Sequence, residues 1–184
     1  IRSEAKSMEE LVEQLLFLAR GDSGRNTLEL APVNLAALVS EVAGESAMID
    51  ADHAYELGFS TNAASDERFV VTCDASMVKQ SARVIVQNAA RYSATGTRIL
   101  LDVAADADSV SYSVRDEGMG MSPEEATHVF ERFWRADAAR DASKEGTGLG
   151  LAIARWIVEE HGGTIDLVSH EGVGTRFTVR IPRR

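Results

Sequence analysis

Two glycine-rich segments and one asparagine are the residues of this sequence best suited to chemistry on a phosphorylated ligand. Residues 116–121 carry a carboxylate, Asp116, followed by two glycines, and residues 146–151 carry three alternating glycines. Glycine lets a backbone approach a ligand closely, and amide N–H groups at the start of a helix bind phosphate oxygens. Asn88 lies inside a predicted helix, where asparagine is disfavoured, and its amide oxygen suits Mg²⁺.

Neither glycine segment matches the commonest nucleotide-binding patterns. A dinucleotide-binding turn needs G-x-G-x-x-G between a strand and a helix, and a P-loop needs G-x-x-x-x-G-K followed by Ser or Thr. Both spacings are absent, as are the motifs of protein kinases. A glycine pair by itself most often marks a turn, so the two segments are informative only together with the helix that carries Asn88.

That helix is predicted over residues 75–92, with Asp74 as its N-cap. Its core stripe is expected to consist of Val78, Ala82, Ile85, Val86 and Ala89. An adjacent face carries Val84, Asn88, Arg91 and Tyr92, which are neighbours because residues three and four apart meet on a helix. An isolated helix would make Asn88 an ordinary solvated residue, so its role depends on what faces it.

Hydrophobic periodicity predicts the elements around this helix. Further helices are expected at residues 34–49, 123–130 and 148–161, and strands at 55–60, 69–73, 98–105, 110–115, 164–169 and 175–181. Hairpins dominate this order. We therefore expect an α/β two-layer sandwich with a mixed, mainly antiparallel sheet and helices on one face.

The first stretch, residues 3–20, has apolar residues at alternating spacings of three and four and ends before Gly21. The pattern is typical of an amphipathic helix, which either docks on its own domain or joins a helical bundle. The start is polar and lacks an initiator Met, so we expect that this chain is part of a longer one.

Composition narrows the class of protein. A net charge of −10 makes sequence-independent nucleic-acid binding a poor candidate, because such binding requires clustered Lys and Arg. No apolar run is long enough to cross a membrane. The single Cys73 lies in an apolar run and is expected to be a small core residue of a protein from a reducing compartment.

Five segments together resemble, in order and spacing, the motifs of sensor histidine kinases. They are residues 80–93 (N box), 116–121 (first glycine box), 130–135 (F box), 146–151 (second glycine box) and 174–177 (the Gly-Thr-x-Phe segment). The resemblance covers nearly the whole chain after Gly24, and residues 15–22 are similar to the second helix of the dimerisation and phosphotransfer domain. It implies residues 1–23 as part of that domain, and residues 24–184 as a catalytic domain of the Bergerat ATP-binding fold, shared with DNA gyrase and MutL.

The resemblance also implies roles for individual residues. Asp116 would accept a hydrogen bond from the adenine amine, Tyr92 would lie against the base and Asn88 would hold Mg²⁺. Phe130 and Phe133 would anchor an ATP lid over residues 121–147, which orders when nucleotide binds. The implied ATP-binding set is Asn88, Arg91, Tyr92, Asp116, Gly118, Gly120, Met121, Arg132, Phe133, Lys144, Gly146, Thr147, Gly148, Leu149, Gly150 and Thr175. Arg91 would reach a phosphate, and Arg132 or Lys144 would meet the γ-phosphate.

The implied reaction transfers the γ-phosphoryl group of ATP to a His of the phosphotransfer domain, and then to an Asp of a response regulator. The implied partners are that domain of the same protein, the regulator, and a second copy joined through the bundle helix. The implied location is the cytoplasmic portion of a membrane-anchored bacterial sensor.

The chain departs from the family pattern at three points. Glu117 and Glu145 stand where the family often has Asn and Gly, and the family's acceptor His, which precedes an acidic residue, is absent. The chain's own histidines are expected to be surface or capping residues and not nucleophiles: His53, His128, His161 and His170.

Three alternative functions stay open. Hydrolases of this fold carry a general-base Glu one turn before the Mg²⁺-binding Asn, where this chain has Val84, so a kinase is favoured. An anti-sigma-factor Ser kinase is disfavoured by the F box and the first helix. A nucleotide-binding module without turnover is disfavoured by the intact motifs.

Overall fold

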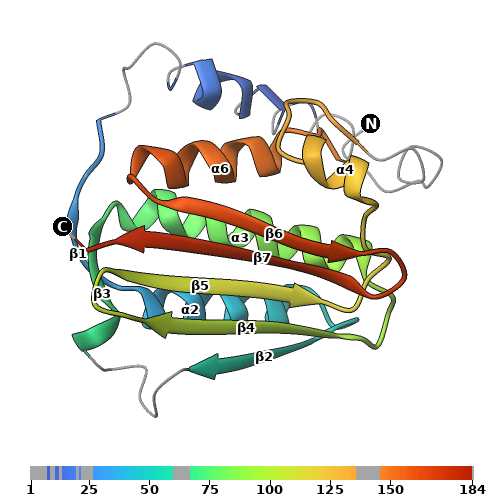
Figure 1. Ribbon diagram of the computed structural model, residues 1–184, viewed down its shortest axis with the longest axis horizontal. Helices are drawn as coiled ribbons and strands as arrows, with labels where there is room; N and C mark the ends of the chain where they lie inside the picture. The colour runs from blue at the N-terminus through green and yellow to red at the C-terminus, as the bar shows by residue number, and fades with distance from the viewer. Residues whose placement is uncertain are drawn as a thin grey trace.

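A five-stranded sheet forms the framework of the protein. The structure is a computed structural model that describes residues 8, 11–12, 14–19, 21, 27–59, 67–135 and 146–183. In spatial order the strands are β2 (Ala54–Phe59), β4 (Arg98–Ala105), β5 (Ser109–Asp116), β7 (Gly174–Pro182) and β6 (Thr164–His170). Only β2 and β4 pair in parallel, and the other neighbours are antiparallel (Figure 1). The predicted mixed, mainly antiparallel sheet is confirmed.

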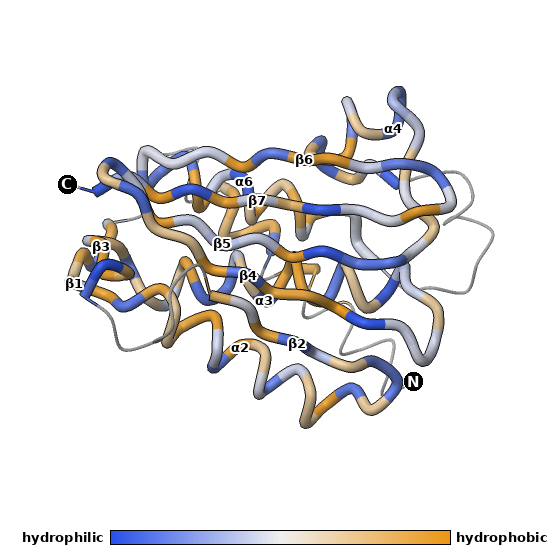
Figure 2. The backbone as a smooth tube through the Cα atoms, turned by 60° about the horizontal axis from the view of Figure 1, so that its bottom comes forward, coloured by the Kyte–Doolittle hydropathy of each residue, from blue (hydrophilic) through white to orange (hydrophobic). Residues whose placement is uncertain are grey.

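Three long helices cover one face of this sheet, as predicted. They are α2 (Leu35–Ile49), α3 (Ala75–Tyr92) and α6 (Gly150–Glu160). Apolar residues alternate along the strands, so each strand turns one row toward the helices; along β7 the alternation can be followed in Figure 2. Inward residues on neighbouring strands stand opposite each other, as Val103 and Tyr112 do, and both are buried.

Local polar groups define where the helices begin. The side chain of Asn34 accepts a hydrogen bond from Ala37 N–H at the start of α2, and Asp74 caps α3 in the same way through Ser76 and Met77. The short helix α4 (Pro123–His128) begins with a reciprocal capping box. The predicted cap at Asp74 is therefore present, and Asn34 caps the preceding helix.

A second, two-stranded sheet differs from the prediction. Strand β1 (Ala31–Asn34) pairs antiparallel with β3 (Val70–Cys73), so the predicted strand at residues 69–73 lies outside the main sheet. Phe69 ends a short 3-10 helix (Glu67–Phe69) and is buried. Cys73 is buried as expected, and burial raises the pKa of its thiol to about 11.

The described residues of the first stretch are helical and pack on the outer side of α6 (Figure 1). Leu18 is 2% exposed and lies in a second apolar cluster with Leu149, Ile153 and Ile157. Phe17 meets the edge of Trp156 at a ring separation of 5.0 Å. The described residues of this helix therefore dock on α6 of the domain that follows them in the chain. No helix among the described residues has the length and apolar character needed to cross a bilayer.

Candidate nucleotide-binding site

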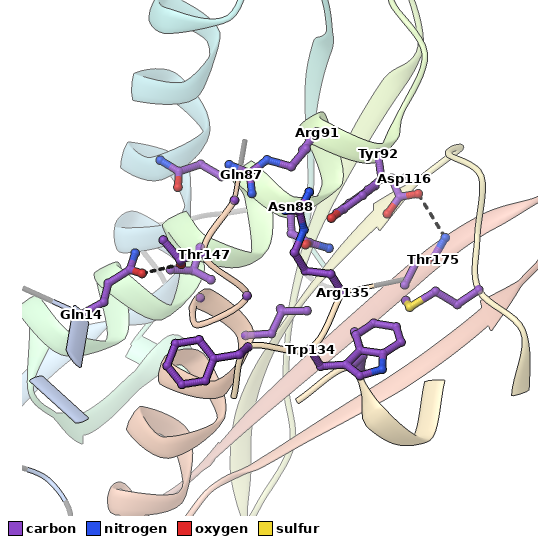
Figure 3. A pocket seen from close by; sticks show the side chains of 18 of the residues that line it. Gln14, Gln87, Asn88, Arg91, Tyr92, Asp116, Trp134, Arg135, Thr147 and Thr175 are labelled. Atoms are coloured by element: carbon purple, nitrogen blue, oxygen red, sulfur yellow. Dashed lines mark hydrogen bonds between the residues drawn. The ribbon is translucent and has the colours of Figure 1, made fainter. Parts of the chain in front are cut away.

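A cavity of about 790 Å³ lies between α3, the end of β5, the start of α6 and the first helix (Figure 3). It has the size and mixed polarity of a small-molecule site. The residues that line it include twelve of the predicted set: Asn88, Arg91, Tyr92, Asp116, Gly120, Met121, Phe133, Gly146, Thr147, Gly148, Gly150 and Thr175.

Asp116, at the C-terminal end of β5, is the buried carboxylate of this cavity. Its Oδ1 atom accepts hydrogen bonds from the backbone N–H of Gly118, at 2.9 Å, and of Thr175, at 3.2 Å. The Oδ2 atom therefore remains available to a donor on a ligand. Asp116 is 5% exposed, and burial raises the pKa of its carboxyl group, although the two N–H donors oppose that shift.

A network of hydroxyl groups holds the strands beside Asp116 in place. The hydroxyl of Ser169 in β6 lies 2.8 Å from that of Thr175 and accepts a hydrogen bond from Met121 N–H at 2.9 Å. The hydrogen bond to Ser169 holds Met121, which comes directly after the glycine turn, in the wall of the cavity. Sequence reasoning named Met121 and Thr175 but missed Ser169, because a single serine on a strand carries no motif.

The glycines after Asp116 allow close packing of the turn that follows β5. A side chain on Gly118 would come within 2.5 Å of the carbonyl oxygen of Tyr92, and Gly118 does not line the cavity. Gly120 has a φ of +66°, and a side chain there would collide with the carbonyl oxygen of His170. These glycines allow the turn to approach α3 and β6 closely, and only Gly120 also borders the cavity.

One face of α3 forms a wall of the cavity. Asn88, Arg91 and Tyr92 lie on it as predicted, together with Gln87 (Figure 3). Val84 also lines the cavity. Val84 lies close to Gly150 at the start of α6, because a side chain on Gly150 would come within 3.1 Å of a methyl group of Val84. The position that would carry a general-base Glu in a hydrolase is thus occupied by a hydrocarbon side chain that contacts α6.

The start of α6 forms the opposite wall. Gly148 has a φ of +72°, and its carbonyl oxygen accepts a hydrogen bond of 2.9 Å from Phe133 N–H. No described side chain caps α6 at Leu149, so backbone N–H groups at its first turn are available to an anion. Leu149 itself is fully buried in the apolar cluster with Leu18 and does not line the cavity.

The aromatic residues of 130–135 separate into two groups. Phe130 packs edge-on against Phe177 of the core, at a centroid distance of 6.0 Å. Phe133 is 57% exposed and has a φ of +65°, a strained conformation for a non-glycine residue. The prediction that both residues anchor this segment to the core is therefore wrong for Phe133, which borders the cavity. Arg132 does not line it, and Lys144, with residues 136–145 of the predicted lid, lies outside the described residues.

Several cavity residues were missed by sequence reasoning. They are Met8, Leu11, Gln14, Gln87, Met119, Val129, Trp134, Arg135 and Leu151. The first three belong to the first helix. Its apolar stripe predicted that the helix packs against another element, but not that this element borders the cavity. Gln87 could have been found from its position one turn before Arg91.

The histidines do not form a reaction centre with the cavity. None of the four lines it, and among the described residues no cluster of His, Cys, Asp and Glu could by itself hold a metal ion. His161 is buried, and its ring joins α6 to the N-cap of α3 by accepting a hydrogen bond of 3.0 Å from Asp74 N–H. It is a capping residue, as predicted, but not a surface one.

Comparisons with known proteins agree with this geometry. The sequence profile of the family described as "Histidine kinase-, DNA gyrase B-, and HSP90-like ATPase" matches residues 73–184, more than half of the chain. The sensor protein SrrB of Staphylococcus aureus is 33% identical over the whole chain, which spans 31% of the length of SrrB.

Solved structures give the same result. The full-length structure of ShkA in complex with AMPPNP superimposes with a TM-score of 0.84 at 25% identity, covering 98% of this chain and 37% of ShkA. The mycobacterial sensor histidine kinase MprB gives a TM-score of 0.70 at 26% identity, covering 84% of this chain and 98% of that structure. The chain belongs to the family of histidine kinase-, DNA gyrase B- and HSP90-like ATPases. Within that family it is the ATP-binding catalytic domain of a sensor histidine kinase.

Proposed function

We propose that this domain binds ATP with Mg²⁺ and supplies the γ-phosphoryl group for transfer to a histidine of a phosphotransfer domain, and from there to an aspartate of a response regulator. The proposal rests on one observation, which is that a single cavity has two chemically different ends. At one end a buried carboxylate oxygen of Asp116 is available, and at the other lies the start of α6, which no described side chain caps. A purine with an amine and a chain of phosphates matches these two ends.

The adenine would bind at the Asp116 end. Its exocyclic amine would donate to Asp116 Oδ2, with Tyr92 against the ring and Met121 and Thr175 at its edge. Guanine carries a carbonyl oxygen in place of that amine, which would face the carboxylate with no proton between them. This end of the cavity therefore favours adenine nucleotides.

The phosphates would extend toward the start of α6. Backbone N–H groups of Gly146, Thr147, Gly148 and Gly150 would bind phosphate oxygens, with the guanidinium of Arg91 lying against Gly146. The N–H of Leu149 donates instead to the hydroxyl of Thr147. We retain Arg132 and Lys144 as candidate contacts of the γ-phosphate, although the described cavity does not include them.

Asn88 would hold the Mg²⁺ ion. Mg²⁺ usually takes one or two protein ligands and completes its shell with water and phosphate oxygens. The cavity fits that requirement, because Asn88 lines it and the described residues contain no carboxylate cluster that would bind a metal without nucleotide. When bound, the ion would neutralise charge that develops on the phosphates.

Phosphoryl transfer is favoured over hydrolysis by Val84. A hydrolase would need a group on this face to take a proton from the attacking water, and a valine methyl group cannot do so. The domain's contribution is then positioning and charge neutralisation, which is what phosphoryl transfer requires.

The partners follow from this role. We propose that residues 1–23 belong to the dimerisation and phosphotransfer domain, that full-length protein dimerises through it, and that the domain works in the cytoplasmic part of a bacterial sensor. The first helix packs on α6 through Leu18, so residues of the proposed phosphotransfer domain contact the ATP-binding domain. A nucleotide-binding module without turnover and a Ser kinase are the alternatives that the experiment separates.

The test incubates the full-length protein with ATP labelled at the γ-phosphate and examines the bound label. Acid-labile, base-stable phosphate on histidine is expected, and the Asn88→Ala variant should lose it. Acid-stable label would indicate a Ser kinase, and absence of label despite nucleotide binding would indicate a module without turnover. In parallel, calorimetry should give ATP an affinity at least about tenfold above that of GTP, because a charge-assisted hydrogen bond is worth about 1.5–3 kcal/mol.

A further inference from the structure

The first helix contributes a polar side chain to the nucleotide cavity. Gln14 lines the cavity, and its Oε1 atom accepts a hydrogen bond of 2.7 Å from the hydroxyl of Thr147. Figure 3 places Gln14 and Thr147 at the side of the cavity remote from Asp116 and Thr175. A ligand that puts its base at Asp116 would therefore bring the far end of its phosphate chain toward Gln14.

The hydrogen bonds of Thr147 determine which way the Gln14 amide points. The Thr147 hydroxyl accepts from Leu149 N–H at 3.3 Å, and it has one proton of its own to donate. That proton needs an acceptor, which the Gln14 carbonyl oxygen provides and its NH₂ group could not. The N–H groups on Nε2 of Gln14 therefore take no part in this contact, and no described residue accepts a hydrogen bond from them.

Apolar contacts hold Gln14 in this place. Leu18, one helical turn further along, is buried against Leu149, which lies between Gly148 and Gly150. Phe17 also contacts Trp156 on α6. The first helix and the segment expected to bind phosphates are therefore packed against each other, and Gln14 needs no large movement to reach a ligand there.

We propose that Gln14 is a ligand of the terminal phosphate, and that its Nε2–H group makes the site prefer a nucleoside triphosphate over a diphosphate. The inference rests on the proposed function, because it assumes that a nucleotide binds with its phosphates at the start of α6. Only the triphosphate has a group that extends beyond the α6 segment toward the first helix. Binding energies are reciprocal, so a triphosphate also strengthens the docking of this helix on α6.

The decisive variant is Gln14→Glu. Glutamate keeps an oxygen for the Thr147 hydroxyl, removes the NH₂ donors and adds a negative charge beside the phosphate. Calorimetry with Mg²⁺ should show that affinity for AMPPNP falls about tenfold or more relative to affinity for ADP. Gln14→Ala should lower the same ratio by a smaller factor. Gln80→Glu on α3, outside the cavity, makes the same change in charge and should leave the ratio unchanged.

A second measurement follows the helix itself. The chain has two tryptophans, so in a Trp134→Phe background the emission reports Trp156 and its contact with Phe17. AMPPNP should change this emission more than ADP does, and Gln14→Glu should abolish the difference. Equal effects of the two nucleotides would contradict the inference.

The outcomes distinguish this inference from the proposed function. Binding of both nucleotides with a ratio that Gln14→Glu leaves unchanged, or a variant that weakens both equally, would overturn the role of Gln14 and leave the proposed function standing. Failure of the unaltered protein to bind either nucleotide would overturn both.

Discussion

The Oδ1 atom of Asp116 accepts a hydrogen bond of 3.2 Å from the backbone N–H of Thr175, which lies 59 residues further along the chain. This contact joins the last residue of β5 to the start of β7, and both described donors to this carboxylate bond the same oxygen, Oδ1. The same buried group thus contributes to the structure of the sheet edge and to recognition of the ligand. Replacing it should separate the two effects.

Asp116→Asn should abolish adenine recognition while keeping the fold. The amide oxygen can still accept from Gly118 and Thr175, but the NH₂ group would then face the adenine amine with no acceptor between them. The affinity for AMPPNP should fall by roughly 1.5–3 kcal/mol, measured by calorimetry. Unchanged affinity would contradict the assignment of Asp116.

The same substitution should remove one contribution that lowers stability as pH rises. Burial raises the pKa of Asp116 in the folded state, so the folded protein is penalised for the charged form. The contribution of this group to the free energy of unfolding is greatest below its ordinary pKa and falls as pH rises through the raised value. The stability of Asp116→Asn relative to the unaltered protein, measured in urea titrations, should therefore increase as pH rises above the ordinary pKa of an Asp carboxyl group. A difference that decreases with pH would have the wrong sign.

Gly148 and Gly172 form a matched pair for testing the start of α6. Both have positive φ, at 72° and 71°, but a side chain on Gly148 would meet the carbonyl carbon of Phe133 at 2.8 Å, whereas Gly172 has open space. Gly172→Ala should cost about 1–2 kcal/mol of stability through conformation alone. Gly148→Ala should cost more and also weaken nucleotide binding, because it separates the Phe133 and Gly148 backbones. Equal costs without loss of binding would refute the importance of this contact.

His161 should be required for stability. Its Nδ1–H donates to the carbonyl of Ile157 at 2.7 Å, and its Nε2 accepts from Asp74 N–H. His161→Phe would leave the buried Asp74 N–H unpaired, which should lower the free energy of unfolding by about 1–3 kcal/mol. The exposed His170 is the control, and His170→Phe should stay within about 0.5 kcal/mol. Similar effects of both variants would show that the contact has no energetic role.

Local signals in the sequence were sufficient for most of the elements and for much of the cavity. Helix α3 could be predicted because its apolar spacing and the Asp74 cap act within a few turns, and they place Asn88, Arg91 and Tyr92 on one face. The strands of the hairpins could be predicted because short connections keep their partners adjacent in the chain. The two glycine segments, which begin at Asp116 and Gly146, could be recognised from their residue types and order, and residues of both line the cavity.

Contacts between distant segments were decided by the tertiary structure alone. Strand β1 exists because residues 31–34 find a partner in β3, and its four residues carry too little pattern to show this in advance. Gly118 is needed because Tyr92 lies behind it, and Gln14 reaches the cavity only because Leu18 packs on α6. Periodicity determines which face of an element is apolar, but the partner of that face depends on packing across the whole molecule.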